Sequence, residues 1–151
     1  MAEIVPDEGL DYMLGVLLAG ATQDTTLFVG LFTSQSPTTV PARGATGGAS
    51  PSGWTEMVAS SGVYARIAIA TSDWGAPTTS GSGRRRTLTA AKQFTGFVGA
   101  AAANGFFLST NSASGAGDTI LCFANFDRGV ARTFATLADV ENLTPRLQLD
   151  G

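Results

Sequence analysis

The sequence predicts a mainly β protein: an antiparallel β-sandwich or jelly-roll-like fold of about eight strands with one N-terminal α-helix. Only one stretch, near the N-terminus, has the apolar spacing of an amphipathic helix. The remainder alternates short apolar runs with clusters of Gly, Ser, Pro and Asn at near-regular spacing, as sandwiches and barrels do. We expect the 151 residues to form one domain, because a chain of this length can bury a single core.

The helix is expected over residues 7–20, within the stretch PDEGLDYMLGVLLAG. Asp7 is a candidate N-cap, acidic residues follow it in the first turn, and Gly20 is a natural stop. Apolar residues at i, i+4, i+7 and i+8 form one stripe, made of Leu10, Leu14, Leu17 and Leu18. The favoured interpretation is that this stripe docks onto its own domain. The alternative is that it binds a partner.

Strands are expected over the runs that follow the helix: residues 26–33, 62–70, 85–92, 94–100, 104–110, 119–126, 130–134 and 143–150. Asn104-Gly105 is a hairpin-turn signal, and Pro145 assigns the last strand to a sheet edge because proline cannot donate to a ladder. Residues 34–62 are predicted to be a long loop that makes contacts, since they lack periodicity and exceed an ordinary connection.

The composition points away from catalysis. The chain has no His, which is the usual base beside a Ser or Cys nucleophile, and its one cysteine, Cys122, lies in an apolar run. A single cysteine leaves neither an intrachain disulfide nor a thiolate cluster for zinc, and no phosphate-binding loop motif is present. We therefore expect a protein that is not an enzyme and uses no cofactor or metal.

The low content of charged residues indicates a protein whose surface packs against other protein molecules. Charged residues make up 14% of the chain, against the ~25% typical of soluble domains. A weakly charged surface suits packing against copies of the chain or a partner, and the alternative is a soluble monomer rich in small residues. The net charge of −3 argues against direct nucleic-acid binding. Since no secretory signal or bilayer-length apolar run is visible, we expect no membrane association and synthesis in a cytoplasm.

Aromatic and arginine side chains dominate many interfaces, which makes eight residues candidates for partner contact: Pro37, Pro41, Arg43, Trp54, Arg66, Arg84, Arg85 and Arg86. Arg66 shares one face of the 62–70 strand with Tyr64, and we expect it to make a cross-strand or inter-subunit contact. The three adjacent arginines are expected to pair with carboxylates of a neighbouring subunit or partner, or to form a solvated turn. No aromatic residue is interleaved with them, as single-strand nucleic-acid binding would need.

The order of the segments is familiar. EGLDYMLGVLL precedes TTLFVGLF, then YARIAIATSDWGAP, then GFFLST with a Gly-rich turn before TILCFANF, and finally LTPRLQL. This order, over about residues 8 to 150, resembles small structural proteins of tailed bacteriophages of the capsid decoration or cement type.

The resemblance implies a virion protein that assembles in the bacterial host cytoplasm as a homotrimer or other oligomer. It would bind the outside of the head shell, bridge neighbouring major capsid proteins and stiffen the shell against the pressure of packaged DNA. Two alternatives stay open. One is a tail- or fibre-associated virion subunit, because a fold does not fix a function. The other is a carbohydrate-binding β-sandwich module with Trp54, Tyr64 or Trp74 as its stacking platform.

Overall fold

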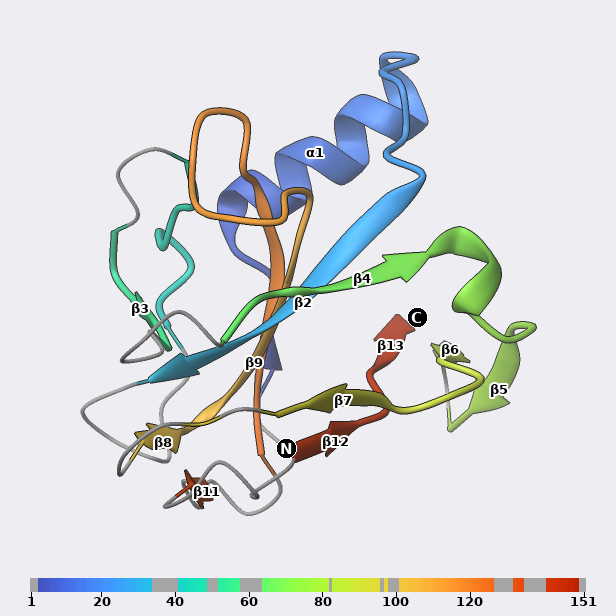
Figure 1. The fold of residues 1–151 in the computed structure, drawn as a ribbon. Coiled ribbons are helices and arrows are strands. Elements are labelled where there is room, and N and C mark those ends of the chain that lie inside the picture. Colours follow the sequence, from blue (N-terminus) through green and yellow to red (C-terminus); the bar gives the residue numbers. More distant parts are fainter. Residues whose placement is uncertain are drawn as a thin grey trace.

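The computed structural model is mainly β, with antiparallel sheets and one α-helix at the N-terminus, which confirms the predicted fold class (Figure 1). It describes residues 3–33, 41–48, 52–57, 64–81, 83–95, 97, 101–126, 132–134 and 141–149. The helices are α1 (Asp7–Leu18) and the short 3-10 helix η1 (Thr71–Asp73). The strands are β1 (Glu3–Ile4), β2 (Thr26–Thr33), β3 (Thr55–Glu56), β4 (Ile67–Ala70), β5 (Thr78–Ser80), β6 (Gly83–Thr87), β7 (Lys92–Phe94), β8 (Ala101–Ala103), β9 (Gly105–Ser109), β10 (Ile120–Asn125), β11 (Arg132–Phe134), β12 (Glu141–Leu143) and β13 (Arg146–Leu149).

The main sheet is built around β2, in the order β1-β10-β9-β2-β3 with β4 also paired to β2. All these pairings are antiparallel, and β9 lies along one side of β2. The other side of β2 is shared, because β4 pairs with Thr26–Val29 and β3 pairs with Phe32 and Thr33. Its central residues are buried whichever face they point to, as the sequence of this strand predicts.

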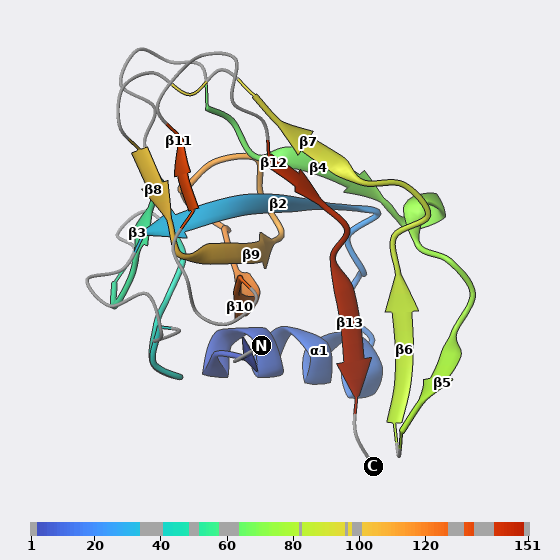
Figure 2. The same cartoon turned by 90° about the horizontal axis from the view of Figure 1, so that it is seen from below.

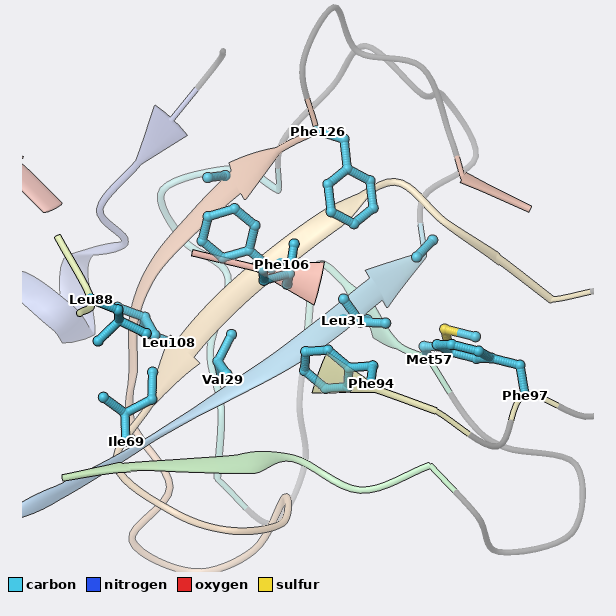
Figure 3. Packing of buried hydrophobic residues seen from close by; sticks show 13 residues of the cluster. Val29, Leu31, Met57, Ile69, Leu88, Phe94, Phe97, Phe106, Leu108 and Phe126 are labelled. Atoms are coloured by element: carbon cyan, nitrogen blue, oxygen red, sulfur yellow. The ribbon is translucent and has the colours of Figure 1, made fainter. Parts of the chain in front are cut away.

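One face of the main sheet is covered by a second layer. Three smaller antiparallel sheets, β13-β6-β5, β12-β7 and β11-β8, complete the fold. Leu88, Phe94 and Leu143 from this part of the chain belong to one buried cluster with Val29 and Leu108 of the main sheet (Figure 3). Two β layers that enclose a shared apolar core make the arrangement sandwich-like.

A second buried cluster contains Phe32, Phe107 and Phe123. Successive side chains of a strand point to opposite faces, so Phe107 joins this cluster while its neighbour Phe106 joins the first one. The Phe32 and Phe123 rings meet edge to face with centroids 5.6 Å apart, a favourable arrangement for an aromatic pair. The main sheet is therefore covered by apolar side chains on both faces.

The first turn of α1 fixes the helix against β10. Glu8 Oε1 accepts hydrogen bonds from the backbone N–H groups of Ile120 (2.6 Å) and Gly47 (2.8 Å). A Cβ added at Gly9 would lie 2.7 Å from the carbonyl oxygens of Ile120 and Leu121, so glycine is needed for this close approach. The helix itself differs slightly from the prediction: Pro6, rather than Asp7, is the N-cap residue, and the last helical residue is Leu18.

Several local strand predictions are wrong. The strand expected over residues 85–92 is two strands, because β6 ends at Thr87 and β7 begins at Lys92. Asn104-Gly105 does not form a hairpin turn, since β8 pairs with β11 whereas β9 pairs with β10 and β2. Gly105 serves packing instead: a Cβ there would lie 2.1 Å from the carbonyl oxygen of Ala124. The expected 34–62 loop contains β3, but β13 does lie at the edge of its sheet as predicted.

Candidate functional site

Arg66 is the centre of a polar group of side chains, which we call the Arg66 cluster: the buried Arg66, Asp118 and Ser109, the half-buried Glu56 and the exposed Ser114. The Arg66 side chain is 1% exposed, and it pairs with Glu56 Oε2 at 2.8 Å and with Asp118 Oδ2 at 3.0 Å. Its guanidinium also donates to the hydroxyls of Ser109 (2.9 Å) and Ser114 (3.0 Å). One cation thereby joins β3, the segment before β4 and the loop that follows β9.

The prediction that Arg66 makes an inter-subunit contact is wrong, because burial leaves its guanidinium no access to a partner. The contact lies within the chain, which was the other alternative. The expectation that Tyr64 and Arg66 point the same way is confirmed, since both hydrogen-bond Glu56 Oε1. The Tyr64 hydroxyl also accepts from the backbone N–H of Leu31 at 2.7 Å, so it binds the cluster to β2.

The environment of the cluster shifts the pKa values of three groups. Burial raises the pKa of Asp118 above its ordinary value, although the Arg66 charge opposes this, and Asp118 Oδ1 is buried without a hydrogen-bond partner among the described residues. Burial and the charge of Glu56 raise the pKa of the Tyr64 hydroxyl, which keeps that group protonated. Burial opposes the charged form of Arg66, but Glu56 and Asp118 together raise its pKa. These properties suit a structural cross-link.

The described ranges offer no metal site in the form of three or more His, Cys, Asp or Glu side chains gathered together. Two carboxylates do meet in the Arg66 cluster, yet both bind the same guanidinium. Within the same ranges, no helix combines the length and apolarity needed to cross a bilayer.

The long-loop candidates Trp54 and Pro41 face inward. The Trp54 ring packs against Phe107 with centroids 4.7 Å apart, and its Nε1 donates to the carbonyl of Thr46 at 2.8 Å. Pro41 is buried. The prediction that Pro41 is a partner contact is therefore corrected, because it is buried, whereas Trp54 is half-buried against the second core cluster and its role as a contact stays a prediction. Trp54 and Tyr64 are both half-buried, and each makes contacts inside the protein: the Trp54 ring with Phe107, and the Tyr64 hydroxyl with the backbone of Leu31.

Arg43 and Pro37 complete the long-loop candidates. Arg43 is exposed and pairs with Asp7 at 2.6 Å, both side chains being more than half exposed. An exposed pair of this kind leaves the guanidinium accessible to a partner. Pro37 lies outside the described residues.

The three adjacent arginines lie on β6, between β5 and β13, and not on a free turn. Arg84 and Arg86 are exposed and Arg85 is half-buried, as alternation along a strand requires. The guanidinium of Arg84 donates to the Thr79 hydroxyl at 3.1 Å, and that of Arg86 donates to the Gly75 carbonyl at 3.4 Å. Neither pairs with a carboxylate of any residue that the structure describes, so both charges remain open on this strand.

Three of the four leucines of the predicted stripe are exposed, which is opposite to the favoured prediction, and the fourth, Leu10, is half-buried. Leu14, Leu17 and Leu18, which we call the α1 stripe, are 52%, 77% and 80% exposed. The helix docks onto its own domain through its other side, where Gly9 is buried and Tyr12 is half-buried. The small residue at Gly9 decides the docking face, because it lets the helix approach β10 more closely than a leucine could.

An apolar groove of about 580 Å³ lies between α1 and β6. In Figure 1, α1 lies above and β6 lies below and to the right, and Figure 2 shows the same elements from below, with β6 beside β13. The groove is lined by Tyr12 and Met13 of α1, Arg86 of β6, Trp74 after η1, and apolar residues of β9 and β10. The Tyr12 hydroxyl donates to Asp24 at 2.9 Å, and burial raises its pKa.

The groove and the outward direction of the α1 stripe are the features that the sequence reasoning missed. The groove is formed by segments far apart in the chain, and no local pattern marks it. The spacing of the leucines did mark the stripe, but it carries no information about what covers the stripe.

The chain matches no known protein family model and no curated protein sequence. The resemblance to phage decoration proteins therefore stays a prediction. Function has to be argued from the geometry of the α1 stripe, the groove and the arginines of β6.

Proposed function

We propose that this chain is a non-enzymatic virion structural protein of the capsid decoration type. In this role it binds the outer surface of a phage head shell and bridges neighbouring major capsid proteins. The order of its segments supports the proposal, and so does the distribution of its apolar and charged side chains. A tail- or fibre-associated position in the virion is the alternative.

The observation that carries the proposal is the exposed α1 stripe. Burying a leucine side chain contributes about 1.5–3 kcal/mol, and this helix leaves three of them largely in water. Exposed apolar groups gathered on one element mark a surface that another chain covers, either a second copy of this protein or a shell protein. Because the neighbouring groove is also apolar, the whole region has the character of an interface core.

The charges around this region support adhesion to protein. Arg84 and Arg86 present guanidinium groups without a described carboxylate partner, and such groups pair well with carboxylates at interfaces. A shell offers the same partner surface many times over. Weak contacts repeated across a lattice give strong attachment without a tight single site.

The test is co-sedimentation of the purified full-length protein with empty head shells and, separately, with purified tails. We expect saturable binding to shells and none to tails. Absence from the shell pellet overturns the decoration role, and binding to tails alone favours the alternative.

Point variants sharpen this experiment better than a deletion of residues 36–54, which would remove Ala45 and Trp54 from the second core cluster. Substitution of the exposed Arg84 by Ser should weaken binding to shells while the fold is kept, as circular dichroism would show. Substitution of the exposed Ser112 by Ala is the control at another surface. Equal loss of binding in both variants would argue against a specific role for β6.

A further inference from the structure

Two exposed apolar features of this protein have complementary shapes. The α1 stripe is a ridge: Leu14 and Leu18 are four residues apart on one helix face, which is about 6 Å along the axis. The groove is a hollow of about 580 Å³, within the range of cavities that enclose most of a ligand's surface. The α1 stripe of one copy can fill the groove only of another copy, and this contact would bury both apolar surfaces.

The charges beside the ridge and the hollow are opposite. Asp11 precedes Leu14 by three residues and Leu18 by seven, so its carboxylate lies on the same helix face as the α1 stripe. It is exposed and makes no ion pair with a residue that the structure describes. Arg86 lines the groove, is exposed, and likewise has no described carboxylate partner. A ridge that carries an acid thus fits a hollow that carries a base.

We infer that the occupant of the groove is the α1 stripe of a second copy of this chain, with Asp11 of one copy facing Arg86 of the other. The groove is lined by Met13 of α1, which lies one turn before Leu17, so the groove and the α1 stripe adjoin but are different patches. The contact therefore joins different patches of the two copies, and such contacts close into rings when the rotation permits. This inference rests on the proposed assembly role and names the partner of its apolar surface.

The experiment measures the mass of the full-length chain in solution, without shells, by light scattering and sedimentation over a range of concentrations. We expect a closed oligomer for the unaltered chain. The stripe variant, Leu17→Glu with Leu18→Glu, should be monomeric, with association weakened at least about 100-fold because two leucines can no longer be buried. The groove variant, Thr71→Trp, fills the hollow from an exposed position on its rim and should also be monomeric.

Mixing the two variants gives the decisive result. The stripe variant keeps an intact groove and the groove variant keeps an intact α1 stripe, so one good contact can form between them. We expect an equimolar mixture to form a heterodimer and nothing larger. Variants that fail to pair in the mixture would overturn the seating of the α1 stripe in the groove.

Two controls keep the test independent of folding and of charge. Ser112→Glu with Ala113→Glu adds the same two charges at exposed positions of another loop and should leave the oligomer intact. Far-ultraviolet circular dichroism should be the same for all variants. A monomeric unaltered chain that still binds shells would overturn this inference and leave the proposed function standing. An oligomer that ignores shells would do the reverse.

Discussion

Arg66 and Arg86 are the same side chain in opposite settings. Arg66 is buried and bound by Glu56 and Asp118 of its own chain, and its guanidinium also lies over the Phe107 ring at 4.9 Å. Arg86 is exposed at the rim of an apolar groove, where its guanidinium makes one long hydrogen bond, to the Gly75 carbonyl, and no ion pair within the described residues. The Arg66 charge is neutralised by carboxylates of its own chain, whereas the Arg86 charge is available to a partner.

The comparison extends to the regions around these two residues. The guanidinium of Arg66 finds its carboxylate and hydroxyl partners within the described chain, so this charge needs no partner from outside. Around Arg86, the apolar groove and the α1 stripe leave both a charge and apolar surface without a described partner. A protein that folds through one region and assembles through the other would show different responses to mutation in the two places.

The largest expected effect is a loss of folding stability when the Arg66 cluster is broken. Arg66→Met removes the cation from two carboxylates that remain partly or fully buried, and breaking such a group costs about 3–5 kcal/mol. We expect this loss in the free energy of unfolding, measured with urea in the monomeric stripe variant so that association does not contribute.

Arg84→Met is the matched control, because this arginine is exposed and should change stability by less than about 0.5 kcal/mol. A cost below about 1 kcal/mol for Arg66→Met would mean that the cluster does not hold the fold together.

Much of this contrast lies beyond local sequence patterns. Alternation predicts that Tyr64 and Arg66 share a side, and the structure agrees. Alternation cannot predict that the partner of Arg66 is Asp118, which is 52 residues away. A lone arginine in an apolar strand suits a buried cluster and an interface equally well, and only tertiary contacts decide between them.

The same limit applies to α1. Its periodicity and its position were predictable, because spacing and turn residues are local. Which face it docks with was not, since that depends on the fit of Gly9 against the β10 backbone. The fold class was predictable from the many short strand patterns, whereas the groove needed the three-dimensional arrangement of α1, β6 and β10.

The next largest effect is a weaker association between copies when Arg86 or Asp11 is changed. Arg86→Glu should raise the dissociation constant of the oligomer about 10-fold, because it places a carboxylate opposite Asp11 of the neighbouring copy. Asp11→Arg should weaken association by a similar factor. A chain that carries both changes should recover to within about 3-fold, as measured by sedimentation; losses that simply add would rule out this pairing.

A smaller effect is expected from the pH dependence of Asp118. Its pKa is raised in the folded protein above the ordinary value of 3.8, so the folded state binds the proton more tightly than the unfolded state does. The stability that this carboxyl contributes is therefore present below that ordinary value and is lost as the pH rises through the folded pKa. Asp118→Asn removes this dependence.

The measurement compares urea unfolding of the Asp118→Asn variant and its parent from neutral pH down to about pH 4, both in the monomeric stripe background. We expect the two to differ by less than about 1 kcal/mol at neutral pH, since burial already disfavours the charge. The parent should gain stability relative to the variant as the pH falls. The opposite trend would show that the Arg66 ion pair outweighs the burial of Asp118.

The smallest effect is expected for Arg43, which pairs with Asp7 on the surface. Both side chains are more than 60% exposed, and pairs of this kind contribute about 0–1 kcal/mol and are screened by salt. Arg43→Ala should lower the free energy of unfolding by less than about 0.5 kcal/mol at low salt, and the difference should vanish in 0.5 M salt (roughly a 4 Å screening length). A larger loss that resists salt would place Arg43 with Arg66 among the residues that hold the fold. Unchanged stability would place Arg43 with Arg86, among the exposed arginines that are available to bind a partner.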